Sequence, residues 1–310
     1  MADHHSHSHG HSHGAGATTG KLTAVVAIAW LVFAFQLVGA LVTGSLALLF
    51  DTVHVLTDAL GVSVALAASY LATRPSSMKR TWGWKRVEVL SAMFQAAILL
   101  GVGALVVVKS IQRFFNPVPM PGQEILLFGV IGLMGNAVMI AVLLGGDRQN
   151  FNMRAAFLEV VNDALGSVAV ILSALAIWAW GWYSADAVVA LLIGLLIIPR
   201  TLKLLRETVS VLLESTPPNL DLAQLQQHLE SQKHVVAVHD LHASQIASDL
   251  PVLTAHVVLR DECFDTGHSV EILKSLQNCV NEHFEVSIKH STFQLEPQSL
   301  QESEHYAHLP

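Results

Sequence analysis

The sequence predicts a membrane protein in which an all-α bundle of six transmembrane helices is followed by a small α/β domain. Of its 310 residues, 52% are apolar and only 13% are charged, about half the charged share of a typical soluble domain. The apolar residues gather in runs of about twenty, the length of a helix that spans a bilayer. From about Glu214 onward these runs end, and the shorter patterns of a soluble domain begin.

Six apolar runs are expected to cross the membrane. The first is flanked by a His-rich segment rather than a short basic one, and five more follow it, so we interpret it as a retained helix and not as a signal peptide. The approximate residues of the six runs are 22–43, 46–72, 87–113, 124–145, 155–180 and 184–205. The expected organisation is a flexible His-rich tail over 1–20, a membrane domain over 21–213, a soluble domain over 214–297 and a flexible tail over 298–310.

Positive charge predicts the orientation of the helices. Lys and Arg are concentrated between the second and third runs, around the segment between the fourth and fifth, and at the end of the sixth, whereas 43–45 and 181–184 contain none. Loops rich in Lys and Arg stay in the cytoplasm, so both termini and the soluble domain are predicted to be cytoplasmic. The net charge of -7 and the isoelectric point near 6.2 argue against a nucleic-acid partner.

Ionisable side chains inside two predicted spans are the main functional signal, because charge at bilayer depth is costly and marks function. His54 and Asp58 are four residues apart in the second span, and so are Glu159 and Asp163 in the fifth. This spacing places both members of a pair on one helix face. Two facing helices would offer one imidazole and three carboxylates to a tetrahedral divalent metal, zinc above all. Cobalt, manganese and iron also suit these ligands.

A buried ion-pair network is the alternative for these four residues. Such a network needs Lys or Arg at the same depth, and neither span offers one near its middle, so a bound cation is favoured.

Two further residues are interpreted as accessory. Asp51 lies one turn before His54 and suits either an entrance or a helix end, whereas Asn136 in the fourth span is interpreted as an interhelical hydrogen-bond partner rather than a ligand.

The C-terminal segment is expected to form an α-β-β-α-β unit. The apolar residues of 221–233 and 269–284 have helical spacing, whereas 235–244, 253–259 and 286–295 are expected to be strands. About eighty residues give only a marginal hydrophobic core, so dimerisation would help the stability of this domain.

Three segments resemble motifs of the cation diffusion facilitator family, most of all its bacterial cobalt–zinc–cadmium resistance branch. Val42–Asp58 is similar to the family's signature in the first two helices, Thr81–Arg86 to a motif at the start of the third, and Asn152–Ser167 to its fifth-helix motif. The resemblance runs from about residue 20 to 297. It implies a homodimer in the inner membrane of a bacterium, with a ferredoxin-like cytoplasmic domain, that exports zinc or a related ion from the cytoplasm in exchange for protons.

The resemblance also implies roles for particular residues. The two pairs in the second and fifth spans would form the transport site. Many zinc-selective members have His where this sequence has Glu159, and the resistance branch has a carboxylate there, so strict zinc selectivity is not expected. In the soluble domain His239, His256 and Glu296 match positions that hold regulatory metal, with His290 as a candidate fourth ligand. The alternative is that these are ordinary surface histidines.

The remaining histidines and cysteines divide into two groups. Cys263 and Cys279 lack the spacing of a zinc motif and cannot form a disulfide framework, so we interpret them as bystanders. We interpret His228, His234 and His283 as ordinary histidines. Ser and Gly interrupt the N-terminal histidines, which favours native sequence over a tag, and such tracts bind metal. This His-rich tail consists of His4, His5, His7, His9, His11 and His13.

The pattern as a whole predicts a transporter rather than an enzyme. An intramembrane hydrolase is disfavoured because the sequence lacks HExxH and GxSxG, and because four protein ligands leave no open position on a metal. A membrane-anchored metal sensor is the other alternative, although a sensor does not need carboxylates in mid-span. The expected ligands are zinc, as substrate and as regulatory ion, and protons as counter-substrate. Membrane lipid would surround the helices, and no organic cofactor is expected.

Overall fold

The computed structural model describes residues 13–71, 76–144, 151–247 and 250–301. The described residues form two compact units, one within 1–73 and 91–205 and the other within 74–90 and 206–310. Each unit has its own hydrophobic core.

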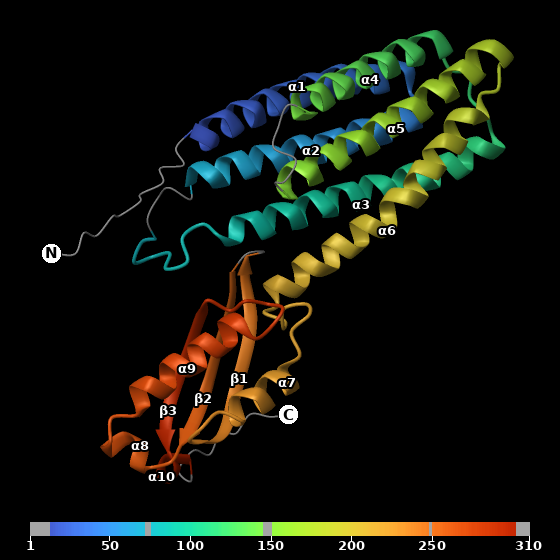
Figure 1. Ribbon diagram of the computed structural model, residues 1–310. Helices are drawn as coiled ribbons and strands as arrows, with labels where there is room; N and C mark the ends of the chain where they lie inside the picture. Colours follow the sequence, from blue (N-terminus) through green and yellow to red (C-terminus); the bar gives the residue numbers. More distant parts are fainter. Residues whose placement is uncertain (1–12, 72–75, 145–150, 248–249, 302–310) are drawn as a thin grey trace. The chain divides into compact units, whose positions relative to one another are not determined.

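Long helices make up the first unit (Figure 1). They correspond to the six apolar runs of the sequence, but α1 begins within the expected N-terminal tail and α6 continues beyond residue 205. Once a helix is nucleated, each further residue adds a hydrogen bond at little cost, so apolar helices extend into their flanks. The helices are α1 (His13–Thr43), α2 (Leu46–Leu71), α3 (Arg86–Phe115), α4 (Gly122–Leu144), α5 (Phe151–Trp180) and α6 (Ser184–Leu212).

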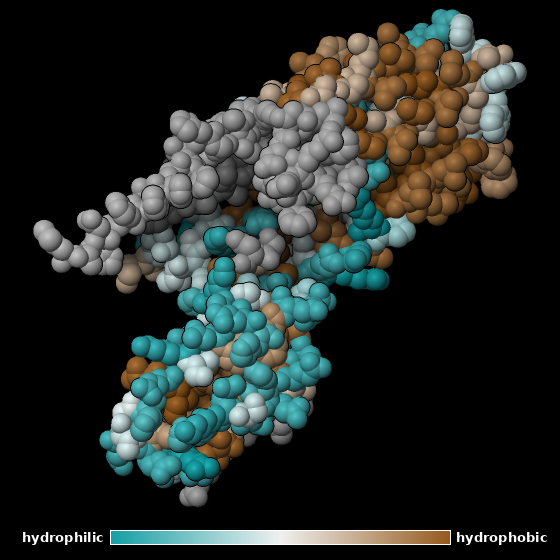
Figure 2. Space-filling view, viewed as in Figure 1, coloured by the Kyte–Doolittle hydropathy of each residue, from teal (hydrophilic) through white to brown (hydrophobic). Residues whose placement is uncertain are grey.

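Over the described residues, five helices are long and apolar enough to cross a membrane. The continuously described part of α2, residues 46–61, is shorter than a span, and it contains Asp51, His54 and Asp58. Large apolar side chains are exposed on the helices, including Leu41 at 73% and Leu196 at 79%, and Figure 2 shows apolar surface over their described part. Exposed apolar surface of this extent marks contact with lipid or with another protein. The five segments are Thr23–Thr43, Arg86–Phe115, Gly122–Val142, Val160–Trp180 and Ser184–Leu212.

Four of the helices pack around one another: α1 contacts α2 and α4, and α5 contacts α2 and α4. Glycine permits the crossing of α1 and α4. A Cβ on Gly135 of α4 would collide with Val32 of α1, and one on Gly39 of α1 would collide with the ring of Phe128 on α4. Small residues at such crossings let helix backbones approach closely in membranes. The tight packing holds α2 beside α5, where the polar side chains meet.

Asp186, fully buried at the start of α6, caps α2 from a different helix. Its carboxylate accepts a hydrogen bond from the Ser45 hydroxyl and from the backbone N–H groups of Leu46 at 2.7 Å and Ala47 at 3.3 Å. The first N–H groups of a helix have no partner within the helix, and an anionic acceptor there also complements the helix dipole. Asp186 therefore fixes where α2 begins.

The second unit has the expected α-β-β-α-β order with two short helices added. Its three described strands form a mixed sheet in the order β1-β2-β3, with β1 and β2 antiparallel and β2 and β3 parallel. α7 contacts β1 and α9, and α9 also contacts β3. The elements are α7 (Leu222–Glu230), β1 (Val235–Ala247), β2 (Leu250–Leu259), α8 (Glu262–Asp265), α9 (Ser269–Glu282), β3 (His290–Pro297) and α10 (Gln298–Gln301).

The third strand starts later than the sequence predicts, at residue 290 instead of 286. The segment before it returns along the end of α9, where the N–H of Ile288 donates to the carbonyl of Val280 at 3.1 Å. Ile288 is fully buried in the same core as Leu276. Burial against a helix, rather than pairing with β2, therefore explains the apolar pattern of 286–289.

Candidate metal centre

Three of the four residues predicted for the transport site meet between α2 and α5. His54 and Asp58 lie one turn apart on α2, and Asp163 lies on α5. His54 Nε2 is 3.2 Å from Asp163 Oδ1 and 3.7 Å from Asp58 Oδ2. One ligand atom from each residue lies within 4.8 Å of the others. Nitrogen and oxygen ligands of a tetrahedral zinc ion are about 3.3 Å apart, so the three side chains are close enough to hold one ion.

The cluster is shielded from solvent. The exposed fractions of the side chains are 5% for Asp163, 18% for His54 and 21% for Asp58. The Nδ1 atom of His54 is buried and has no hydrogen-bond partner among the described residues. Two carboxylates and an imidazole in such a place are costly unless a cation or protons compensate them. The arrangement is therefore suited to exchange between a metal ion and protons.

Glu159, the fourth predicted ligand, lies one turn before Asp163 on the backbone of α5. Its side chain is outside the part of the chain that the structure describes. The helical spacing places residues 159 and 163 on one face of α5, and the role of Glu159 as a ligand stays a prediction.

A hydrogen-bonded network lies next to the cluster along α2. Asp51, 3% exposed, accepts hydrogen bonds from Gln36 Nε2 at 2.7 Å and from Ser167 Oγ at 3.3 Å. Ser167 Oγ in turn accepts from Asn136 Nδ2 at 3.3 Å. The network links α1, α2, α4 and α5, and it includes both predicted accessory residues. Sequence reasoning missed Gln36 and Ser167, although a buried amide within an apolar span is a signal of its own.

Two glycines make room for this network. A Cβ on Gly166 would lie 2.9 Å from Asp51 Oδ1, and one on Gly132 would collide with Gln36 Nε2. Polar side chains from neighbouring helices therefore take the space that side chains at these two positions would fill, and this keeps Asp51 in position one turn before His54.

A separate cluster forms on the sheet of the C-terminal domain. His239 on β1 and His256 on β2 are direct neighbours in the antiparallel register, and both contact Glu296 on β3. His239 Nε2 is 3.2 Å from Glu296 Oε2, and His256 Nδ1 is 2.7 Å from Glu296 Oε1. Glu296 is fully buried. The structure thus brings together three of the four residues predicted for regulatory metal, and their ligand atoms lie within 4.8 Å of one another.

His290 is not part of this cluster, which corrects its assignment as a fourth ligand. It is the first residue of β3 and precedes Glu296 by six residues, about 20 Å along an extended strand. Its ring instead packs edge-on against Trp82, with 4.8 Å between ring centroids. The sequence alone did not show that the cluster lies at the end of β3 opposite to His290.

Asp240 contributes the further carboxylate near these histidines. Its Oδ2 is 3.7 Å from His256 Nε2, and its Oδ1 is 2.9 Å from His242 Nε2. The strand is irregular between His239 and His242, and Asp240 has a φ of 49°. A hydrogen bond from His242 lowers the pKa of the Asp240 carboxyl below its usual value. This carboxylate therefore stays ionised at neutral pH beside the cluster.

The predicted ligands of the His-rich tail lie almost entirely outside the described residues. His13 begins α1, but its side chain is not described. The others are His4, His5, His7, His9 and His11.

Two sequence profiles match nearly the whole chain. One describes the cation efflux transmembrane domain and matches residues 22–213, and the other describes the cytoplasmic domain of cation efflux proteins and matches residues 217–298. The chain belongs to the cation efflux family. The resemblance to cation diffusion facilitators seen in the sequence is therefore confirmed, and the C-terminal α/β unit is the cytoplasmic domain of a cation efflux protein.

Relatives from several bacteria are similar over most of their length. The metal cation efflux system protein CzcD of Cupriavidus metallidurans is 36% identical over 261 residues, which are 84% of this chain and 81% of CzcD. The cadmium, cobalt and zinc/H(+)-K(+) antiporter of Bacillus subtilis is 33% identical, over 85% of this chain and 84% of its own. The zinc transporter ZitB of Escherichia coli is 35% identical, over 85% and 82% respectively. Metal cation export is thus the activity of the family, which is one of transporters and not of enzymes.

Proposed function

We propose that this cation efflux protein exports zinc, and with it cobalt and cadmium, from the cytoplasm in exchange for protons. His54, Asp58, Glu159 and Asp163 are the transport site. The observation that carries the proposal is the meeting of partly buried His54 and Asp58 with buried Asp163 between two apolar helices. α2 contains no Lys or Arg, and α5 has none after Arg154. A bound metal ion or protons therefore supply the compensating positive charge.

Competition between metal and protons provides the coupling. With a divalent ion bound, three carboxylates and a neutral imidazole leave a net charge of about minus one. Without the ion, the carboxylates repel one another at close range and some must take up protons. Metal and protons therefore use the same lone pairs, so release of one accompanies binding of the other.

Alternating access would move the site between the two sides of the membrane. In the state open to the cytoplasm, the four ligands lose protons and bind the ion. Movement of the helices then exposes the site to the outside, where protons displace the metal. A fixed site near the midplane with rocking helices around it is the general arrangement of secondary transporters. Asp51 and its partners Gln36 and Ser167 would steady α2 during this movement.

The membrane arrangement follows from the same reasoning. α2 is the sixth span, and it carries two of the metal ligands, His54 and Asp58. The distribution of Lys and Arg supports cytoplasmic termini, and the bacterial origin of the relatives supports placement in the cell membrane of a bacterium. The chain is a homodimer in which exposed apolar helix surface and the ferredoxin-like cytoplasmic domain take part. The His-rich tail concentrates metal near the cytoplasmic entrance.

Flux measurements on purified protein in proteoliposomes test the transport proposal. We expect uptake of zinc, cobalt and cadmium to be driven by a proton gradient and to fall to background when the gradient is collapsed. Manganese should be transported least, because it prefers harder ligands than imidazole. Flux that ignores the gradient would indicate a channel, and metal binding without flux would indicate a sensor.

The cluster of His239, His256 and Glu296 is proposed to bind regulatory zinc. Removing both histidines would leave the buried Glu296 carboxylate with the Gln294 amide, at 2.7 Å from Oε1, as its remaining partner. Loss of the partners of a buried charge costs about 3–5 kcal/mol, so a change of Glu296 itself gives the clearer test. Glu296→Gln keeps the size of the side chain but removes its charge.

In Glu296→Gln we expect one metal ion fewer per protomer, measured by elemental analysis of the purified protein. Transport should fall only in part, because the residue is not in the membrane site. Glu271→Gln makes the same chemical change at an exposed position of α9 and should leave the metal content unchanged. Equal metal content in the two variants would show that the cluster is a structural hydrogen-bond network.

A further inference from the structure

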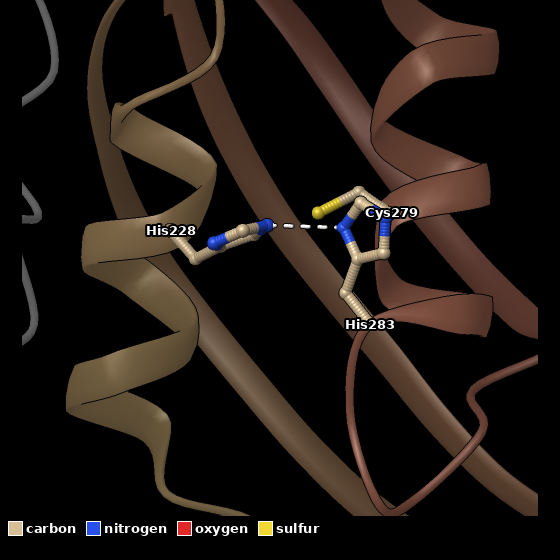
Figure 3. Close-up of side chains that lie close together, drawn as sticks. All are labelled: His228, Cys279 and His283. Carbon is tan, nitrogen blue, oxygen red and sulfur yellow. Dashed lines mark hydrogen bonds between the residues drawn. The ribbon is translucent and has the colours of Figure 1, made fainter.

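A further group of metal-binding side chains lies in the cytoplasmic domain. His228 is on α7, Cys279 is on α9, and His283 directly follows α9 (Figure 3). One ligand atom from each lies within 4.8 Å of the other two. Cys279 and His283 are four residues apart, so they lie on one face of the helix end, and packing of α7 against α9 brings His228 to them.

The two imidazole rings are already oriented toward each other. His228 Nε2 and His283 Nδ1 are 3.1 Å apart, close to the separation of about 3.3 Å between two nitrogen ligands of a tetrahedral zinc ion. The ring of Phe284 packs edge-on against His228, with 5.5 Å between ring centroids. This contact restricts the rotation of His228 and keeps Nε2 directed at His283.

The sulfur of Cys279 points toward the gap between the two rings in Figure 3. The residue is 2% exposed, and burial raises the pKa of its thiol. The amide of Gln232 donates to Cys279 Sγ at 4.0 Å. A donor of this kind orients a sulfur ligand and supports its negative charge once a metal is bound.

The surroundings favour a cation. A pocket of about 790 Å³ opens beside His228 and His283, and the residues that line it include Asp221 and Glu285 but no Lys or Arg. The carboxylates make the local potential negative. The pocket also gives water access to His228 and His283.

We propose that His228, Cys279 and His283 bind a divalent cation of borderline softness, the class of zinc, cadmium and cobalt. A water molecule from the pocket completes a tetrahedral set. On binding, the S–H bond of Cys279 breaks, the sulfur electron pair forms the bond to the metal, and the proton passes to solvent. One thiolate and two imidazoles favour these ions over magnesium, calcium and manganese. The inference does not depend on the transport mechanism, because none of the three residues is in the membrane site.

A bound ion would join α7 to α9 and so stabilise the cytoplasmic domain. A ligand that binds only the folded state raises its stability in proportion to the logarithm of ligand concentration. The stability of this domain would then follow the metal level of the cytoplasm. The cytoplasmic domain would thus respond to metal separately from metal binding at the His239 cluster, which is formed by His239, His256 and Glu296.

Cobalt provides a selective probe, since a cysteine thiolate bound to Co²⁺ gives a charge-transfer absorption that imidazole and carboxylate ligands do not. The chain has two cysteines, and neither the membrane site nor the His239 cluster contains sulfur. We expect the full-length, reduced protein in detergent to show this absorption on titration with Co²⁺, saturating at one ion per protomer, and Cys279→Ser to lose it.

Cys263→Ser is the matched control, because Cys263 is also buried, at 1% exposed, but lies on α8. It should keep the absorption. His283→Asn changes an exposed residue and leaves the core intact, and it should raise the cobalt concentration at half-saturation at least about 10-fold, the low end of the loss caused by changing even an outer partner of a metal. An absent absorption, one that survives in Cys279→Ser or one lost in Cys263→Ser would overturn the proposal. An unchanged midpoint in His283→Asn would also overturn it.

Discussion

Asp163→Asn is expected to abolish metal transport while the protein still inserts and folds. Asp163 lies on α5 with its Oδ1 atom 3.2 Å from His54 Nε2, and it is the most buried of the three described ligands. Asn has nearly the same shape but carries no charge. Changing an outer partner of a metal already costs about 10–100-fold in affinity, so loss of a direct anionic ligand should cost at least about 100-fold. Insertion depends on the apolar spans, which the change leaves intact.

Asn162→Ala is the control for this variant. Asn162 is the neighbour of Asp163 in sequence but is exposed, whereas Asp163 is buried. Zinc uptake into proteoliposomes should be near normal in Asn162→Ala and at background in Asp163→Asn, with equal amounts of folded protein in both. Substantial uptake by Asp163→Asn would mean that the buried cluster is structural and that the ion takes another path.

The helices and the pairing of the membrane ligands could be predicted from the sequence because both depend on local geometry. A run of twenty apolar residues spans a bilayer whatever its neighbours are. A spacing of four residues fixes which side chains share a helix face, so the spacing alone is enough to pair His54 with Asp58. The pairing of α2 with α5 was predicted from the motif resemblance. The contact between His54 on α2 and Asp163 on α5 agrees with that prediction.

Features that depend on contacts between distant segments could not be predicted in this way. The regulatory cluster uses the position of Glu296 at one end of β3, which excludes His290 at the other end. Asp240 reaches the cluster because β1 is irregular there, and irregularities of this kind leave no mark in the alternation of apolar residues.

The site formed by His228, Cys279 and His283 illustrates both cases. The spacing of Cys279 and His283 is visible in the sequence, although Cys279 also fits the apolar face of α9, which favours its interpretation as a bystander. His228 is 51 residues before Cys279, and only the packing of α7 on α9 brings it to the pair.

Glu159→His is expected to narrow the selectivity of transport toward zinc. The change converts a site of one imidazole and three carboxylates into a site with two of each. Imidazole is a softer ligand than carboxylate and favours zinc over harder ions such as manganese. The substitution also removes one of three mutually repelling negative charges, so the empty site should hold fewer protons at neutral pH. Flux of cobalt and manganese relative to zinc should fall, and the dependence of zinc flux on external acidity should weaken.

The position on α5 makes this test specific. Residue 159 is one turn before Asp163 on the same helix face, and the same His-to-carboxylate spacing already occurs on α2 between His54 and Asp58. Glu159→Asp retains the charge and the hard oxygen ligand, so it should keep the order of ion preference even if the rate drops. Competition between zinc and the other ions, with a pH profile, would be measured in reconstituted vesicles. If Glu159→His leaves both the ion order and the pH profile unchanged, Glu159 does not touch the ion, and the three described ligands must share it with water or with a different residue.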